Sequence, residues 1–125
     1  MQVIEFLGRM FLSTLFLIEG INKIFNYEET ILYMESFDVP EYFAIPAIIL
    51  EILFPLLLII GYQTKIAALV IAVFTVTVAI IFHTNFDDHM QLITFFKDIA
   101  IAGGFIIIFI NGAGKFSLDY RLKSK

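Results

Sequence analysis

Seven ionisable residues of this 125-residue chain lie within or at the ends of long apolar stretches. They are Arg9, Glu19, Lys23, Glu51, His83, Lys97 and Asp98. A charged side chain near the centre of a bilayer costs about 2.5–3.5 kcal/mol on insertion scales, and such residues usually face the protein interior and serve a function. Carboxyl, ammonium and imidazole groups can together bind a polar group and pass protons to or from it. We therefore take these seven as candidate ligand-binding or proton-relay residues.

The composition that surrounds these residues is that of a membrane protein. Apolar residues make up 60% of the chain and the mean hydropathy is +0.93, whereas ordinary globular chains are about 45–50% apolar. The net charge of −4 argues against a nucleic-acid partner, which requires a basic face. The chain has no cysteine, which excludes disulfides, thiolate catalysis and cysteine-ligated metals.

Four stretches are apolar over the roughly 20 residues that a helix needs to cross a bilayer. They cover residues 3–25, 42–62, 64–82 and 92–110. Short connections after the second and third stretches predict antiparallel neighbours. The longer connection, residues 26–41, predicts a short amphipathic helix on the membrane surface, ended by Pro40. The expected fold is therefore all-α: one domain over residues 1–125, built as a bundle of four transmembrane helices with a surface helix between the first two.

The basic residues of the loops and the tail predict the orientation of this bundle. Apart from Lys23 at a helix end, the connections at residues 26–41 and 83–91 have acidic residues and no lysine or arginine. The basic residues outside the spans gather on the other side: Lys65, Lys115, Arg121, Lys123 and Lys125. The positive-inside rule then places both termini in the cytoplasm. Residues 11–18 could pass for the apolar core of a signal peptide, but no basic segment precedes them and no small-residue cleavage site follows, so we expect this helix to be retained.

The candidate residues on different spans lie at comparable depths. A rise of about 1.5 Å per residue places Glu19, Glu51 and the Lys97-Asp98 pair roughly 8–14 Å below the outer ends of their helices, with His83 at the edge. Arg9 lies toward the cytoplasmic half. We expect acids and bases to neutralise one another in a polar pocket in the outer half of the bundle. In the alternative interpretation these residues only hold the helices together, although polar contacts between membrane helices average about 0.6 kcal/mol.

The two histidines raise the question of a haem. Bis-histidine ligation requires both side chains to reach one iron from facing helices. His83 ends the third span and His89 follows in the next loop, which is poor geometry for this purpose. No zinc spacing, nucleotide-binding glycine motif or nucleophile elbow occurs either. We expect no metal and no intrinsic cofactor.

Short motifs along nearly the whole chain carry a resemblance to a known family. They are Gly8-Arg9, Glu19-Gly20-x-x-Lys23-x-Phe25, Tyr33-Met34, Val39-Pro40, Glu51, Gly61, Thr64-Lys65, Phe82-His83, Phe96-Lys97, Gly103-Gly104 and Gly112-x-Gly114-x-x-Ser117-Leu118-Asp119. In this order and spacing the chain resembles the DoxX family of small four-helix membrane proteins. The resemblance implies a bacterial or archaeal cytoplasmic membrane and a role in redox systems. One branch of the family is similar to a subunit of thiosulfate:quinone oxidoreductase, and another sits in assemblies with soluble redox enzymes.

Two functions are compatible with these observations. As a membrane subunit of a quinone-linked oxidoreductase, the chain would bind a quinone through Lys23, Lys97 or His83 and relay protons through its acidic residues. It would require a protein partner with the redox centre, because it has no thiol and no clear metal or flavin site. Alternatively it is a non-catalytic anchor or assembly module for a partner protein. A transporter is disfavoured because no inverted repeat is visible. A homo-oligomer is compatible with either function.

Overall fold

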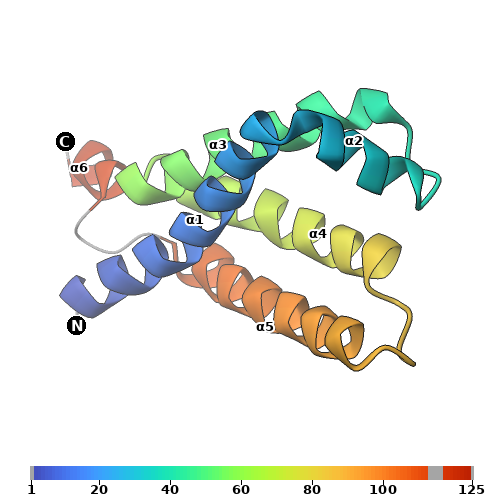
Figure 1. Ribbon diagram of the computed structural model, residues 1–125. Coiled ribbons are helices and arrows are strands. Elements are labelled where there is room, and N and C mark those ends of the chain that lie inside the picture. Colours follow the sequence, from blue (N-terminus) through green and yellow to red (C-terminus); the bar gives the residue numbers. More distant parts are fainter. Residues whose placement is uncertain (1, 113–116, 125) are drawn as a thin grey trace.

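The computed structural model describes residues 2–112 and 117–124, and every regular element within these residues is a helix (Figure 1). In chain order the elements are α1 (Gln2–Phe25), α2 (Tyr27–Glu35), the short 3-10 helix η1 (Glu41–Phe43), α3 (Ala44–Ile60), α4 (Thr64–Phe82), α5 (His89–Asn111) and α6 (Leu118–Ser124). Lys115 and Lys125 of the predicted basic tail, and Gly114 of the last family motif, lie outside the described residues.

Three of the described helices are long and apolar enough to cross a membrane: Glu41–Ile60, Thr64–Phe82 and His89–Asn111. They correspond to the predicted spans 42–62, 64–82 and 92–110, and their ends lie within three residues of the predicted ones. The remaining predicted span, residues 3–25, is the helix α1. It differs from the other three in its charge, because Glu5, Arg9, Glu19 and Lys23 are distributed along it.

Local chemistry explains where the long helices begin and end. Gly61, with a φ of 75°, ends α3 in the left-handed conformation that glycine adopts without strain. The amides of Gly61 and Tyr62 both donate to the carbonyl of Leu57. At the start of α5, the Asp88 carboxylate accepts from the amide of Met90 as an N-cap. This cap starts α5 at His89, three residues before the predicted boundary.

The connection between α1 and α3 is more structured than a surface helix ended by proline. The helix α2 follows α1 directly, and the prediction that Pro40 ends it is wrong. It stops at Glu35, where the Ser36 hydroxyl donates to the Tyr33 carbonyl. The chain then reverses through Asp38 at a φ of 60°. The amide of Val39 donates a hydrogen bond to the carbonyl of Met34, which closes this turn.

The core is built around one small-residue face of α4. Ala67, Ala68, Ile71 and Ala72 are buried there, and small side chains of this kind let helix backbones approach closely. The rings of Phe16 on α1 and Phe105 on α5 meet edge to face above this surface, with centroids 5.5 Å apart. These two phenylalanines are interior residues, whereas Phe11, Phe25 and Phe96 are exposed as lipid-facing side chains would be.

The four long helices pack in the order α1, α3, α4, α5. Figure 1 shows both ends of the described chain at the same end of the molecule, opposite the end that carries α2. The helices α1 and α5 come together toward the end with the termini and diverge toward α2 (Figure 1). At their contact, a Cβ atom on Gly104 would lie 3.2 Å from Leu12 Cδ1, which agrees with a packing role for this glycine. Two pockets lie at the α2 end, where the candidate site is found.

The helix α6 folds back on the turn between α3 and α4 through Asp119. The Asp119 carboxylate accepts from the amides of Gln63 and Thr64 at 2.8 and 2.9 Å, and its own amide donates to the carbonyl of Gly61. It therefore caps the N-terminus of α4 from a distant segment. Burial raises the pKa of Asp119, but the hydrogen bonds from Thr64 and Gln63 and the charge of Arg9 outweigh it, and the pKa lies below its ordinary value.

Replacing Asp119 by alanine is expected to lower the free energy of unfolding at neutral pH by about 0.5–2 kcal/mol, the usual cost of a lost helix cap. Since the folded pKa is below the unfolded one, this stabilisation is present above the unfolded pKa of about 3.9 and is lost as the pH falls through the folded value. Unfolding in mixed micelles at pH 7 and near pH 2 measures the difference. Asp87→Ala, at an exposed loop position, is the control. An equal loss for Asp119→Ala at both pH values would contradict the capping role.

Candidate functional site: a polar cavity at the α2 end

One wall of the site is an ion pair between α1 and α3. The ammonium of Lys23 donates to Oε1 of Glu51 at 2.5 Å. The Glu51 side chain is 2% exposed and the Lys23 side chain 30%. Gly20 makes this pairing sterically feasible, because a Cβ atom there would lie 2.8 Å from Ile52 Cγ1 and 3.3 Å from Glu51 Cβ. The close approach of α1 and α3 at Gly20 thus sets the position of the pair.

The second wall comes from α4 and α5. His83 is the C-cap residue of α4, and its Nε2 lies 3.8 Å from Oδ2 of Asp98 on α5. This separation is within ion-pair range but too long for a hydrogen bond. Both side chains are about one-fifth exposed. The four long helices therefore contribute two acid–base pairs at the same end of the molecule.

Glu19 is an exposed residue of α1 that lines the same cavity as both pairs. It interacts electrostatically with Lys23 on its own helix and with His83, Lys97 and Asp98 on the opposite helices. Lys23 follows Glu19 by one helical turn, as i, i+4 spacing on one face requires. Five of the seven candidate residues, Glu19, Lys23, Glu51, His83 and Asp98, thus line one cavity of about 240 Å³.

The other two candidates lie elsewhere. The side chain of Lys97 is exposed and lines neither of the cavities described here, because a step of one residue turns it about 100° around α5 from Asp98. Arg9 is buried at the opposite end of the molecule, against Gly61 and close to the charges of Asp119 and Glu5. The expected neutralisation of three acids by Arg9, Lys23 and Lys97 in one pocket is therefore wrong for Arg9. The charge of Lys97 acts on Glu19 and Asp98 from outside the cavity, and Lys23 and His83 line it with the three acids.

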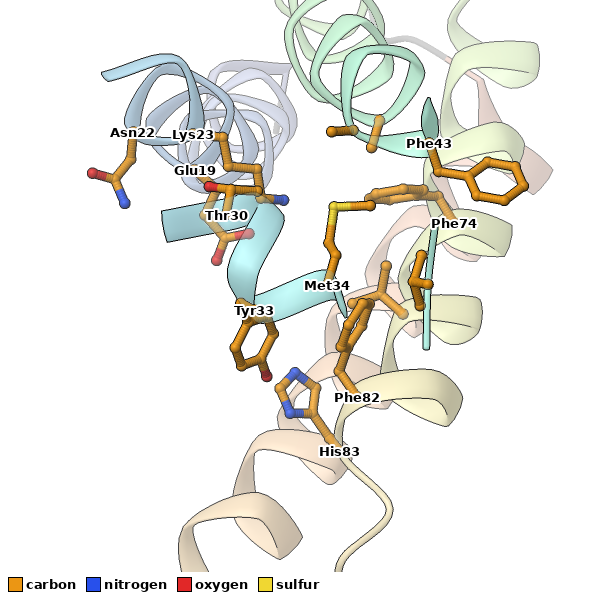
Figure 2. A pocket seen from close by; sticks show the side chains of 14 residues that line it. Glu19, Asn22, Lys23, Thr30, Tyr33, Met34, Phe43, Phe74, Phe82 and His83 are labelled. Carbon is orange, nitrogen blue, oxygen red and sulfur yellow. The ribbon is translucent and has the colours of Figure 1, made fainter. Parts of the chain in front are cut away.

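A second, more apolar pocket of about 380 Å³ adjoins the polar cavity. The two share Glu19, Lys23, Phe74, Val78 and His83, so they are neighbours along these residues. In Figure 2, Asn22, Lys23, Glu19 and Thr30 lie toward one side and Phe43 and Phe74 toward the other. This division suits an amphipathic ligand with a polar head and an apolar body.

The helix α2 covers this apolar pocket. The Tyr33 ring stacks on the Phe82 ring of α4 at a centroid distance of 5.3 Å, and Phe37 meets Phe82 edge to face at 5.0 Å. Met34, a residue of α2, is buried and points into the pocket (Figure 2). Residues of the connection therefore form a wall of the site, which the sequence analysis did not anticipate.

Two threonines also belong to the site, although they are not among the seven candidates. Thr75 on α4 and Thr94 on α5 line the polar cavity. Neutral hydroxyl residues are common in membrane helices, so their type alone gave no signal. The i, i+4 spacing of Thr94 and Asp98 places both on one face of α5, and a search along the face of each charged residue would have found Thr94.

Carboxylates, an ammonium, an imidazole and hydroxyls in one cavity can orient a polar head group and exchange protons with it. Among residues 2–112 and 117–124, no three His, Cys, Asp or Glu side chains are grouped so that they could hold a metal ion. His89, the second histidine considered for haem, is exposed at the start of α5.

Comparison with known proteins identifies the class of this fold. The DoxX family matches residues 4–84, from α1 to the loop after α4, and the chain belongs to this family. It is 36% identical over 118 residues to the inner membrane protein YqjF of Escherichia coli (strain K12), with 94% of the chain and 91% of that relative covered. It is 31% identical over 126 residues to the inner membrane protein YphA of the same organism, with 95% and 90% covered. No solved structure matches the chain.

Proposed function

We propose that the chain is a single-domain, four-span protein of a bacterial cytoplasmic membrane, with α1 as the fourth span and α2 on the outer surface. The charges of α1 support this assignment because Lys23 pairs with Glu51 inside the fold and Arg9 is 4% exposed. The exposed face of α1 carries apolar residues such as Ile4, Phe11 and Ile18. An even number of crossings also agrees with both termini at one end (Figure 1), and the basic residues at that end favour the cytoplasm.

We propose further that the cavity binds a quinone-type molecule, and that the chain serves a redox system as its membrane subunit. The observation that carries this proposal is the pair of adjoining pockets, one lined by charged residues and the other by aromatic walls. A quinone has a polar head that needs hydrogen bonds and proton exchange, and an isoprenoid tail that needs an apolar path. Glu19, His83 and Asp98 would exchange the protons, while Met34, Phe43 and Phe74 would contact the apolar part. The electrons would pass to a redox centre on a partner protein.

Titration of the full chain in lipid nanodiscs with a short-tailed naphthoquinone, followed by calorimetry, tests this function. We expect His83→Phe to weaken binding by up to about tenfold, since it removes an N–H donor to a quinone carbonyl, worth about 0.5–1.5 kcal/mol. His89→Phe is the matched control, because His89 is exposed at the start of α5 and lines neither cavity, and it should leave the affinity unchanged. An absence of binding, or equal effects of the two variants, would reject the quinone site and leave the anchor or assembly function in its place.

A further inference from the structure

Glu51 has a second carboxylate oxygen that no described residue satisfies. Its Oε1 accepts from Lys23, while Oε2 is buried and has no hydrogen-bond partner among residues 2–112 and 117–124. The residue is 1% exposed and lines the polar cavity. A carboxylate that is paired with an ammonium acts as an acceptor at its other oxygen. An unmet buried acceptor is costly, and in native proteins it usually has a specific reason.

The rest of the cavity wall offers further acceptors, and these outnumber its free donors. The hydroxyl of Thr75 donates to the carbonyl of Ile71 at 2.7 Å, and that of Thr94 to the carbonyl of Met90 at 2.8 Å. Both hydroxyls therefore present lone pairs to the cavity. Glu19 and Asp98 add carboxyl groups. The Lys23 ammonium gives one of its three N–H groups to Glu51, and the His83 imidazole is a further donor on this wall. The acceptor oxygens outnumber these free N–H groups, so the wall favours a ligand that brings its own O–H or N–H groups.

We propose that the cavity selects the reduced, hydroquinone form of its ligand over the oxidised quinone. This inference rests on the proposed function and adds the redox state of the bound molecule. A hydroquinone has two O–H donors, and one of them can satisfy Glu51 Oε2. The second can reach an acceptor on the other wall, where His83 and Asp98 stand 3.8 Å apart without a mutual hydrogen bond. A quinone has carbonyl oxygens alone, and these would face Glu51 oxygen to oxygen.

Three ligands of nearly equal shape test the selection: a naphthohydroquinone with one isoprenoid unit, the corresponding naphthoquinone, and the dimethyl ether of the hydroquinone. The ether keeps the ring and tail and removes both donors. Anaerobic calorimetry on the full chain in nanodiscs should give at least about tenfold tighter binding for the hydroquinone than for the other two, the effect of one hydrogen bond to a charged acceptor. Equal or tighter binding of the quinone would overturn the selection while the quinone-type site stands. Failure of all three to bind would overturn both.

The variant Glu51→Gln tests whether Glu51 causes the preference for the hydroquinone over the quinone. In Glu51→Gln the side-chain amide can donate to a quinone carbonyl, so the ratio of the two affinities should fall to near one or reverse. Glu28→Gln, at an exposed position on α2 that lines neither cavity, is the matched control and should keep the ratio of the unmodified chain. An unchanged ratio in Glu51→Gln would reject Glu51 as the selecting group. The comparison of ligands on the unmodified chain decides the selection even if Glu51→Gln does not fold.

Discussion

Lys23→Met is expected to lower the free energy of unfolding by about 3 kcal/mol or more. The substitution removes the partner of a Glu51 side chain that is 2% exposed, and breaking a buried ion pair from one side costs about 3–5 kcal/mol because it leaves an uncompensated charge. The opposite change, Glu51→Gln, should cost less, because the Lys23 side chain is 30% exposed and can extend its ammonium toward water. Unfolding in mixed micelles, followed by circular dichroism, measures both.

The double variant Lys23→Met/Glu51→Gln separates the ion pair from other effects of the two substitutions. With both charges removed, the decrease in the free energy of unfolding should be smaller than the sum of the decreases in the two single variants. The difference is the coupling energy of the pair. Lys97→Met controls for the loss of a lysine at an exposed site and should change the stability little. A Lys23→Met loss no larger than that of Lys97→Met, or strict additivity in the cycle, would contradict a buried pair between α1 and α3.

The positions of the long helices could be predicted because apolar length and charge spacing decide them. The predicted span 64–82 coincides with α4, since Lys65 and the turn at Gly61 limit it on one side and His83 on the other. The gathering of Glu19, Glu51 and Asp98 was also predictable in outline, because a charged side chain in lipid is costly enough to turn each helix toward its neighbours.

Features that depend on rotation and tertiary packing could not be predicted in the same way. Lys97 and Asp98 are adjacent in sequence and were treated as a unit, yet the helix turns one into the cavity and the other away from it. Arg9 shares a helix face with Glu19, but the length of α1 separates them, and Arg9 lies beside α6. The end of α2 at Glu35 depends on contacts of Tyr33 and Phe37 with Phe82, a residue more than forty positions away.

Gly61→Ala is expected to be the most damaging small substitution at the end of the molecule that carries the termini, with a loss of about 2–5 kcal/mol. Gly61 has a φ of 75°, where an L-residue costs about 1–2 kcal/mol. The added Cβ would also lie 2.3 Å from Ser117 Cβ and 2.8 Å from Ser117 Cα, and overpacking typically costs a further 1–3 kcal/mol. The contact with Ser117 includes backbone, so a side-chain rotation cannot relieve it. Unfolding in mixed micelles measures the loss.

The clash predicts a specific route for this loss, because α6 must move to admit the new methyl group. The hydrogen bond from the Asp119 amide to the Gly61 carbonyl, 2.8 Å long, would then break, and the Asp119 carboxylate would leave the N-terminus of α4. Gly61→Ala should therefore also abolish the dependence of stability on pH that Asp119 confers in the acidic range. Gly103→Ala is the matched control: its Cβ would meet no atom within 4 Å, and alanine favours a helix over glycine by up to about 1 kcal/mol. If Gly61→Ala were as stable as Gly103→Ala, or kept the acid dependence of the unmodified chain, the packing of α6 against this turn would be refuted.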